Sequence, residues 1–171
     1  FHGSTISDMS ISGRMTLCNM AIELGGKTGI VEPDEKTYAF LKNRTDNVFN
    51  PVFADKDANY KFIQEIDVDD LEPQIACPHK VDNVKPISQI SGTAINQSFI
   101  GSCTNGRLED LKIAASILKG KKIHPDTRLL VVPASYEVYL KALETGIIQT
   151  LVESGTMFSN PSCGACFGGH I

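Results

Sequence analysis

The feature of this sequence that most limits its fold is the alternation of short apolar runs with helical patterns after residue 95. Three runs rich in β-prone residues lie at positions 97–101, 128–132 and 156–159. Segments of helical periodicity separate these runs, at positions 107–119, 135–143 and 147–154. Such alternation is typical of parallel strands joined by helical crossovers. We therefore expect an α/β fold, with a mostly parallel sheet and flanking helices in three layers.

The helix expected at 107–119 has the clearest pattern. One of its faces is apolar, and it is formed by Leu108, Leu111, Ala115 and Leu118. Residues at this spacing lie on the same side of an α-helix, so we expect this face to pack on the sheet.

The first part of the chain has weaker patterns. A helix is expected at 10–25, where apolar residues recur at helical spacing until Gly25 supplies a stop. A short strand is expected at 28–31, and a second helix from Asp34 to about residue 43. Partial alternation of apolar and polar residues predicts a strand at 60–68. We place a domain boundary near Ile66, which divides the chain into domains at residues 1–66 and 67–171.

Composition narrows the class of protein. The chain has 171 residues, 42% of them hydrophobic, and a formal net charge of −4. The mild acidity gives no basic surface for nucleic acid, and no apolar run is long enough to cross a membrane. The first residues lack the pattern of a signal peptide. The chain begins with Phe1 and stops at Ile171, just after a Cys- and Gly-rich loop, so we expect an excised piece of a longer protein.

Five cysteines, an odd number, argue against a disulfide framework and favour reduced thiols in the cytoplasm. Cys163 and Cys166 form a C-x-x-C pair that follows the strand expected at 156–159, and Cys103 follows the strand expected at 97–101. Loops at the carboxyl ends of parallel strands meet at one edge of the sheet, so the three thiols are expected to converge.

Three thiols allow several kinds of site. A structural zinc ion usually has four protein ligands, of which the sequence supplies one close pair. A thioredoxin-like redox pair would begin a helix, and no clear helix follows Cys166. A 4Fe–4S cluster held by three cysteines would leave one iron free to act as a Lewis acid. The spacing alone leaves the cluster, zinc and incidental thiols open.

The residues around the cysteines resemble the aconitase superfamily. Residues 99–107 (FIGSCTNGR) are similar to its first cluster motif, and residues 160–166 (NPSCGAC) to its second. Residues 15–23 (MTLCNMAIE) and 28–34 (TGIVEPD) resemble a further block of the family. The blocks follow the family's order over nearly the whole chain. In style they are nearest to the large subunits of its two-subunit members, 3-isopropylmalate dehydratase and homoaconitase.

The resemblance implies a hydro-lyase that isomerises a hydroxy acid by removing and re-adding water. It implies that Cys103, Cys163 and Cys166 bind a 4Fe–4S cluster. Asn19 matches an asparagine beside the cluster, and Glu23 matches a catalytic carboxylate near the substrate hydroxyl. The four-residue spacing of Asn19 and Glu23 would put both on one side of a helix.

The resemblance also implies partners. A small subunit that carries the swivelling domain would complete the active site, and the substrate would be a hydroxy di- or tricarboxylic acid. Dehydration of isopropylmalate in leucine biosynthesis is the main hypothesis, and homoaconitase is its alternative. Because other active-site residues of the family have no counterpart here, the chain alone is expected to be inactive. A zinc or redox module without catalysis, or a piece that folds without metal, stay as other possibilities.

Several residues have plainer interpretations. Cys18 is expected to be a small buried apolar residue in its helix. Cys77 and His79 could bind a metal together, but structural loop residues are the favoured interpretation. Arg107 is expected to form an ion pair with Glu109 or Asp110. The remaining histidines are expected at the surface, namely His2, His124 and His170.

Overall fold

The computed structural model describes residues 1–169. The chain forms two compact units, one made of Phe1–Val31 with Ile95–Ile171 and the other of Glu32–Ala94. The limits of these units lie near residues 31 and 94 and not at residue 66. The assignment of residues 1–66 and 67–171 to two domains of a larger protein stays a prediction.

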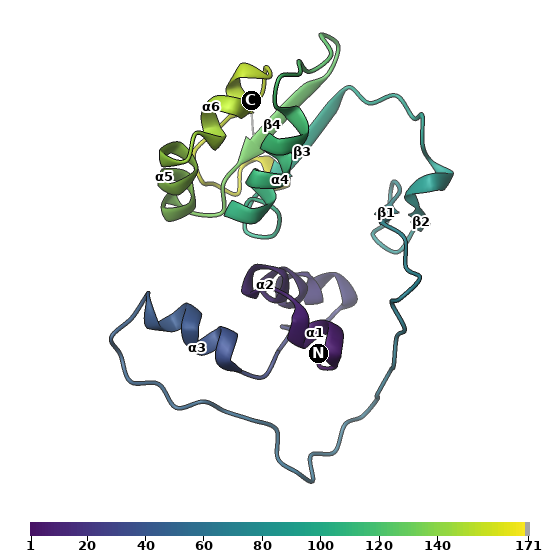
Figure 1. Cartoon of the computed structure of the whole chain (residues 1–171). Coiled ribbons are helices and arrows are strands. Elements are labelled where there is room, and N and C mark those ends of the chain that lie inside the picture. The colour runs from purple at the N-terminus through teal and green to yellow at the C-terminus, as the bar shows by residue number, and fades with distance from the viewer. Residues whose placement is uncertain (170–171) are drawn as a thin grey trace. The chain divides into compact units, whose positions relative to one another are not determined.

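The first unit contains a parallel sheet, as the alternating pattern predicts (Figure 1). Its strands are β3 (Gln97–Gly101), β4 (Arg128–Val132) and β5 (Met157–Phe158), in that spatial order. Both neighbouring pairs are parallel, with Phe99 opposite Leu130 and Val131 opposite Phe158. The predicted α/β class and the three strand positions are confirmed.

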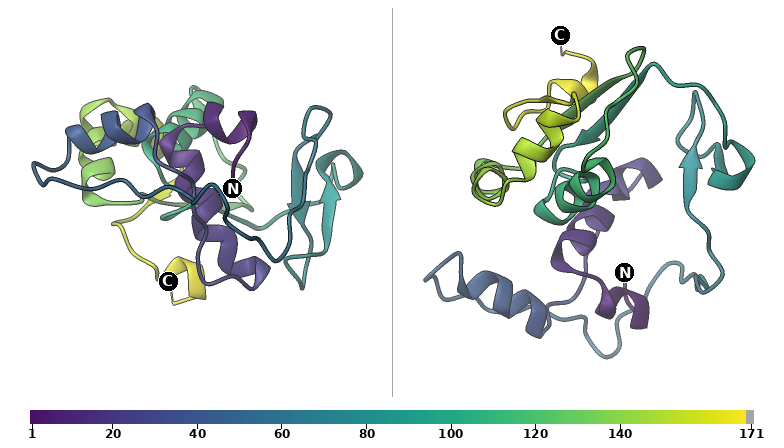
Figure 2. Two further views of the ribbon diagram at one scale, coloured as in Figure 1. Left: turned by 90° about the horizontal axis from the view of Figure 1, so that it is seen from below. Right: turned by 45° about the horizontal axis from the view of Figure 1, so that its top comes forward.

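Three helices connect these strands: α4 (Leu108–Leu118), α5 (Tyr136–Glu144) and α6 (Ile147–Glu153). They pack against one another and share one core with the sheet (Figures 1 and 2). The buried members of that core are Leu111, Ala114, Ala115, Leu129, Val131, Ala142, Ile147 and Leu151. Leu108 and Leu118 are half-buried against it, so the predicted inner face of α4 is confirmed.

Local sequence explains where these helices begin. The Ser135 hydroxyl accepts a hydrogen bond from the Val138 amide at 3.2 Å and caps α5. Gly146 adopts the left-handed conformation, with φ of 73°, and separates α5 from α6. Leu129 and Val131 share a face of β4 because side chains alternate along a strand, and this face meets the helices.

The N-terminal part of this unit is helical but not one continuous helix. It contains α1 (Ser4–Asp8), α2 (Ile11–Asn19) and the 3₁₀ turn η1 (Met20–Leu24), which ends at Gly25. The single α-helix expected at 10–25 is therefore corrected, since its last turn tightens into 3₁₀ geometry. Ala21 in this turn is buried, whereas Leu24 at its end is 81% exposed and adds little packing there.

The short strand expected at 28–31 is wrong. The Gly29 amide instead donates to the Cys18 carbonyl at 3.2 Å, at the end of α2. A Cβ on Gly29 would lie 2.7 Å from Cys18 Cα, so only glycine allows this close approach.

The second unit contains α3 (Glu35–Lys42), the strands β1 (Gln74–Ala76) and β2 (Val84–Pro86), and the 3₁₀ turn η2 (Ile87–Gln89). The two strands form an antiparallel hairpin that the sequence patterns do not predict. The helix α3 is confirmed, and Asp34 caps it by accepting from the Thr37 amide at 3.1 Å. The strand expected at 60–68 is wrong, because that segment is irregular and has no partner strand among the described residues.

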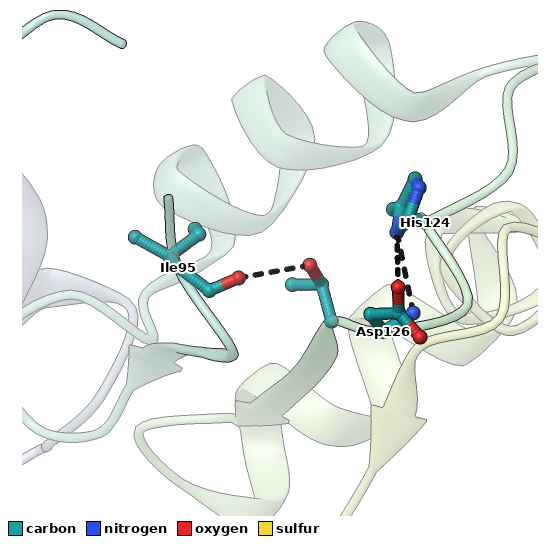
Figure 3. A network of polar contacts seen from close by, with 4 residues as sticks. Ile95, His124 and Asp126 are labelled. Atoms are coloured by element: carbon teal, nitrogen blue, oxygen red, sulfur yellow. Dashed lines mark hydrogen bonds and ion pairs between the residues drawn. The ribbon is translucent and has the colours of Figure 1, made fainter. Parts of the chain in front are cut away.

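The turn before β4 is held by polar contacts (Figure 3). The Thr127 hydroxyl donates to the Ile95 carbonyl at 3.1 Å, and the Asp126 amide donates to His124 Nδ1 at 3.2 Å. The His124 side chain is 71% exposed, which confirms the predicted surface position. His2 is exposed as well, and His170 lies outside the described residues. Within residues 1–169, no helix has the length and apolar character needed to cross a membrane.

Candidate metal centre at the two cysteine loops

The first cysteine lies in a tight turn, residues 102–106, directly after β3. The Gly106 amide donates to the Ser102 carbonyl at 3.0 Å, and the Ala134 amide donates to the Gly106 carbonyl at 2.8 Å. A Cβ on Gly106 would lie 2.6 Å from the Ser102 carbonyl oxygen and still closer to that of Val132. Gly106 therefore lets the turn pack against the end of β4, which fixes the position of Cys103.

Two side chains of helix α2 bind this turn, and the side chain of its N-cap residue binds the start of α4. Thr16 Oγ1 donates to the Thr104 carbonyl at 2.6 Å, and Ser10 Oγ donates to Glu109 Oε1 at 2.8 Å. Asn19 Nδ2, at the end of the helix, lies 3.6 Å from Cys103 Sγ and donates to it. The structure thus brings Asn19 beside Cys103, although 84 residues separate them in the sequence.

The second cysteine loop contains the 3₁₀ turn η3 (Ala165–Phe167), with Cys166 at its centre. The Cys166 amide donates to the Cys163 carbonyl at 3.1 Å, so both cysteines belong to one turn. The Ser102 hydroxyl lies 3.2 Å from Cys166 Sγ and 3.9 Å from Cys103 Sγ. A single hydroxyl group therefore joins the two cysteine loops.

All five cysteines are free, and three of them are exposed, namely Cys103, Cys163 and Cys166. Over residues 1–169, no group of three or more His, Cys, Asp or Glu side chains is close enough to hold a metal ion. The structure thus brings Cys166 towards Cys103 but does not include Cys163 in the same group. The role of the three thiols as ligands stays a prediction.

Glu23 lies in η1 and is exposed. The expectation that it shares a helix face with Asn19 assumed an α-helix from one residue to the other. The chain becomes 3₁₀ at Met20, where four residues advance by about 480° instead of about 400°. The spacing argument is therefore wrong, and the catalytic role of Glu23 stays a prediction.

Asp110 lies in the first turn of α4, just after the first cysteine turn. Its Oδ2 accepts a hydrogen bond from the Arg107 amide at 3.0 Å. Burial raises the pKa of this carboxyl above its ordinary value, and the hydrogen bond from Arg107 partly opposes that rise. The ion pair expected between the Arg107 guanidinium and Glu109 or Asp110 is absent from the described residues, and its Nε is buried without a hydrogen-bond partner there.

A shallow, open hollow of about 280 Å³ lies beside α4 and β3. It is lined by Phe99, Ile100, Asn105, Asp110, Ile113, Ala114 and Ile117. None of the cysteines lines the hollow, although Asn105 of the first cysteine turn does.

The other two cysteines, Cys18 and Cys77, are both half-buried, and their plainer interpretations stay predictions. Cys18 is half-buried in α2, and the Cys77 amide donates to the Asn83 carbonyl at 2.8 Å in the β1–β2 hairpin. His79 is exposed.

Sequence patterns missed three residues that build the site: Ser102, Thr16 and Gly106. Ser102 and Gly106 stand within the first cysteine motif, but a motif does not tell which members touch the second loop. Thr16 makes a contact across 88 residues of sequence, and no local pattern reports such a contact.

The fold and the paired cysteine loops define a protein of the aconitase family (aconitate hydratase), whose model matches residues 1–92 and 88–170. The chain belongs to this family. It is 54% identical, over its full length, to the probable 3-isopropylmalate dehydratase large subunit of Methanothermobacter thermautotrophicus, covering 41% of that protein. It is also 54% identical, over 99% of its length, to the probable methanogen homoaconitase large subunit of Methanosarcina mazei, covering 43%.

The 3-isopropylmalate dehydratase large subunit of Halothermothrix orenii is 49% identical over the full chain, which covers 41% of it. The chain therefore spans about two fifths of the length of these curated relatives.

Proposed function

We propose that this chain is the cluster-binding part of the large subunit of an iron–sulfur hydro-lyase, 3-isopropylmalate dehydratase, which acts in leucine biosynthesis. The observation that carries the proposal is the meeting of the two cysteine loops. One hydroxyl lies 3.2 Å from Cys166 Sγ and 3.9 Å from Cys103 Sγ, in a chain that belongs to the aconitase family.

The donor set fits an iron–sulfur cluster. Cys103, Cys163 and Cys166 would hold it, since thiolates are the usual ligands of such clusters. The Asn19 amide already donates to Cys103 Sγ at 3.6 Å, and such a hydrogen bond orients and tunes a ligand sulfur. When bound, a cluster with three cysteine ligands supplies a Lewis acid for removing a hydroxyl group from the substrate.

The chain's own residues have distinct tasks in this proposal. Thr16 holds α2 on the first cysteine turn and Ser10 binds the start of α4, so that Asn19 stays beside the Cys103 sulfur. Glu23 is exposed in η1, which follows α2. We assign it the supply of the proton with which the substrate hydroxyl would leave as water. The substrate is a hydroxy di- or tricarboxylic acid, and a small subunit completes the site.

Homoaconitase is the second candidate. It is favoured by the equal identity, 54%, to a relative with each of the two names. Purified large and small subunits should be tested together with isopropylmalate and with homoaconitate. A value of kcat/KM well above that for homoaconitate, when measured with isopropylmalate, supports the first candidate. A value well below it supports homoaconitase.

The free thiols further support a cytoplasmic location.

The test of the metal centre is anaerobic reconstitution of the full-length protein with iron and sulfide. Iron and acid-labile sulfide are then measured, and the cluster is examined by electron paramagnetic resonance. We expect a cluster in the wild type and in Cys77→Ala, the control in the other unit. Cys103→Ala should lose it. Zinc without sulfide, or equal clusters in both variants, would contradict the proposal.

A further inference from the structure

Ser102 is the buried residue between the end of β3 and Cys103. It is 5% exposed, one of four buried polar or charged side chains among the described residues. Its carbonyl accepts the Gly106 amide at 3.0 Å, so its backbone belongs to the turn that also carries Cys103. The turn therefore holds the backbone of Ser102 in place.

The recorded hydrogen-bond partners of this hydroxyl, within the described residues, are two sulfur atoms. Oγ lies 3.2 Å from Cys166 Sγ and 3.9 Å from Cys103 Sγ. A buried hydroxyl without a partner costs free energy, so contact between the loops offsets the burial of Ser102. If the second loop moved away, the hydroxyl would lose its nearer partner.

The direction of this hydrogen bond follows from the chemistry of cysteine. A thiol is a weak donor, whereas a thiolate carries no proton and can only accept. With Cys166 as a thiolate ligand, the Ser102 hydroxyl is the donor. Charge-assisted hydrogen bonds of this kind are stronger than neutral ones.

We propose that Ser102 is a positioning residue that holds the second cysteine loop against the first, through a hydrogen bond between its hydroxyl and the Cys166 sulfur. This contact joins the loop that carries Cys103 to the loop that carries Cys166. The Ser102 hydroxyl lies nearer to the Cys166 sulfur, whereas the Asn19 amide donates to the Cys103 sulfur. Any effect of this contact on a cluster rests on the proposed iron–sulfur function. The contact between the two loops does not rest on it.

The first test needs no metal. The full-length protein carrying Cys163→Ser is treated, cluster-free, with a short bifunctional thiol reagent, and the Cys103–Cys166 cross-link is quantified by peptide mapping. Adding Ser102→Ala should slow cross-linking about three- to tenfold, the effect of one lost hydrogen bond. The matched control is Ser162→Ala, an exposed serine beside the second loop's first cysteine, which should leave the rate unchanged.

Circular dichroism and thermal unfolding check that each variant is folded. Ser102→Thr keeps the hydroxyl and should restore cross-linking. An unchanged rate in folded Ser102→Ala would overturn the inference, as would equal slowing in Ser162→Ala.

The second test uses the reconstituted protein. Ser102→Ala should lose iron about tenfold faster on dilution into chelator, and the reduction potential of its cluster should fall. A merely structural role would leave the potential unchanged. If the wild type binds no cluster while cross-linking still depends on Ser102, the proposed function fails and this inference stands. If the cluster forms and neither measurement responds to Ser102→Ala, the proposed function stands and this inference fails.

Discussion

Residues 95–159 and the unit Glu32–Ala94 are almost equal in length but differ in how they bury apolar residues. The first segment contains fully buried side chains, among them Leu111, Val131 and Leu151. In Glu32–Ala94, which the structure describes throughout, no residue is buried. Both segments contain apolar runs, so composition alone does not account for the difference.

The difference lies in what each run can pack against. Strand β4 has a neighbour on each side and helices over one face. The apolar residues of 60–66 have neither, and Phe62 is 76% exposed and Ile66 71%. A strand without partners leaves its amides and carbonyls to water and is not stable alone. An apolar run therefore becomes a strand only where the topology brings another strand beside it.

The largest expected contrast is in amide hydrogen exchange of the 171-residue chain. Amides of Leu130 and Val131, in the central strand, should exchange at least about a hundredfold more slowly than those of residues 60–66, after correction for intrinsic rates. None of the described backbone hydrogen bonds uses an amide of residues 60–66. Mass spectrometry of peptic peptides measures both. Similar protection in the two segments would break the comparison.

Core truncation gives the next effect. Leu111→Ala removes a side chain with 0% exposure and should lower the free energy of unfolding by about 2–5 kcal/mol. The matched change Phe62→Ala, at a side chain that is 76% exposed, should alter it by less than about 0.5 kcal/mol. Urea denaturation compares the two variants. A large loss in Phe62→Ala would mean that the second unit has a core of its own.

Removing a helix cap should have a smaller effect on stability, and this effect should differ between α5 and α3. Ser135→Ala removes the acceptor for the Val138 amide and should cost about 1 kcal/mol of global stability, since α5 packs on the core. Asp34→Ala removes the acceptor for the Thr37 amide, and it should unfold α3 without shifting the main transition. Helical ellipticity and the urea midpoint separate these outcomes. A shift of the midpoint in Asp34→Ala would contradict the independence of α3.

The smallest effect concerns Asp110. Burial raises the pKa of this carboxyl in the folded chain, so the folded state holds the proton more tightly than the unfolded state. Stability from this group is therefore greatest at low pH, and it falls as the pH rises from the unfolded pKa through the folded one. Asp110→Asn should remove that fall while keeping an oxygen for the Arg107 amide. Unfolding curves from acidic to neutral pH measure the difference, and a gap between the proteins that does not change with pH would contradict it.

Sequence patterns predicted the structure well where elements pack on a common core, and poorly elsewhere. The three strands of the sheet and α4, α5 and α6 were predictable, because each has an apolar face that matches its period and meets a common core. The prediction at 60–68 failed because the segment has no strand beside it, and the one at 28–31 failed because Gly29 bonds to the end of α2 and not to a strand. The β1–β2 hairpin was missed because its strands have three residues each and are mostly exposed.

At the candidate site, the sequence by itself determined the chemistry. The family motifs identify which thiols could bind a cluster, and the alternation of elements put Cys103 and Cys166 after two strands of one sheet, which lie on either side of β4. Only the tertiary structure decided which groups touch: Ser102 with Cys166, and Asn19 with Cys103. The physical reason is that motif chemistry is a property of residue type, whereas a contact between residues 64 or 84 positions apart depends on how β3, α2 and the second loop pack.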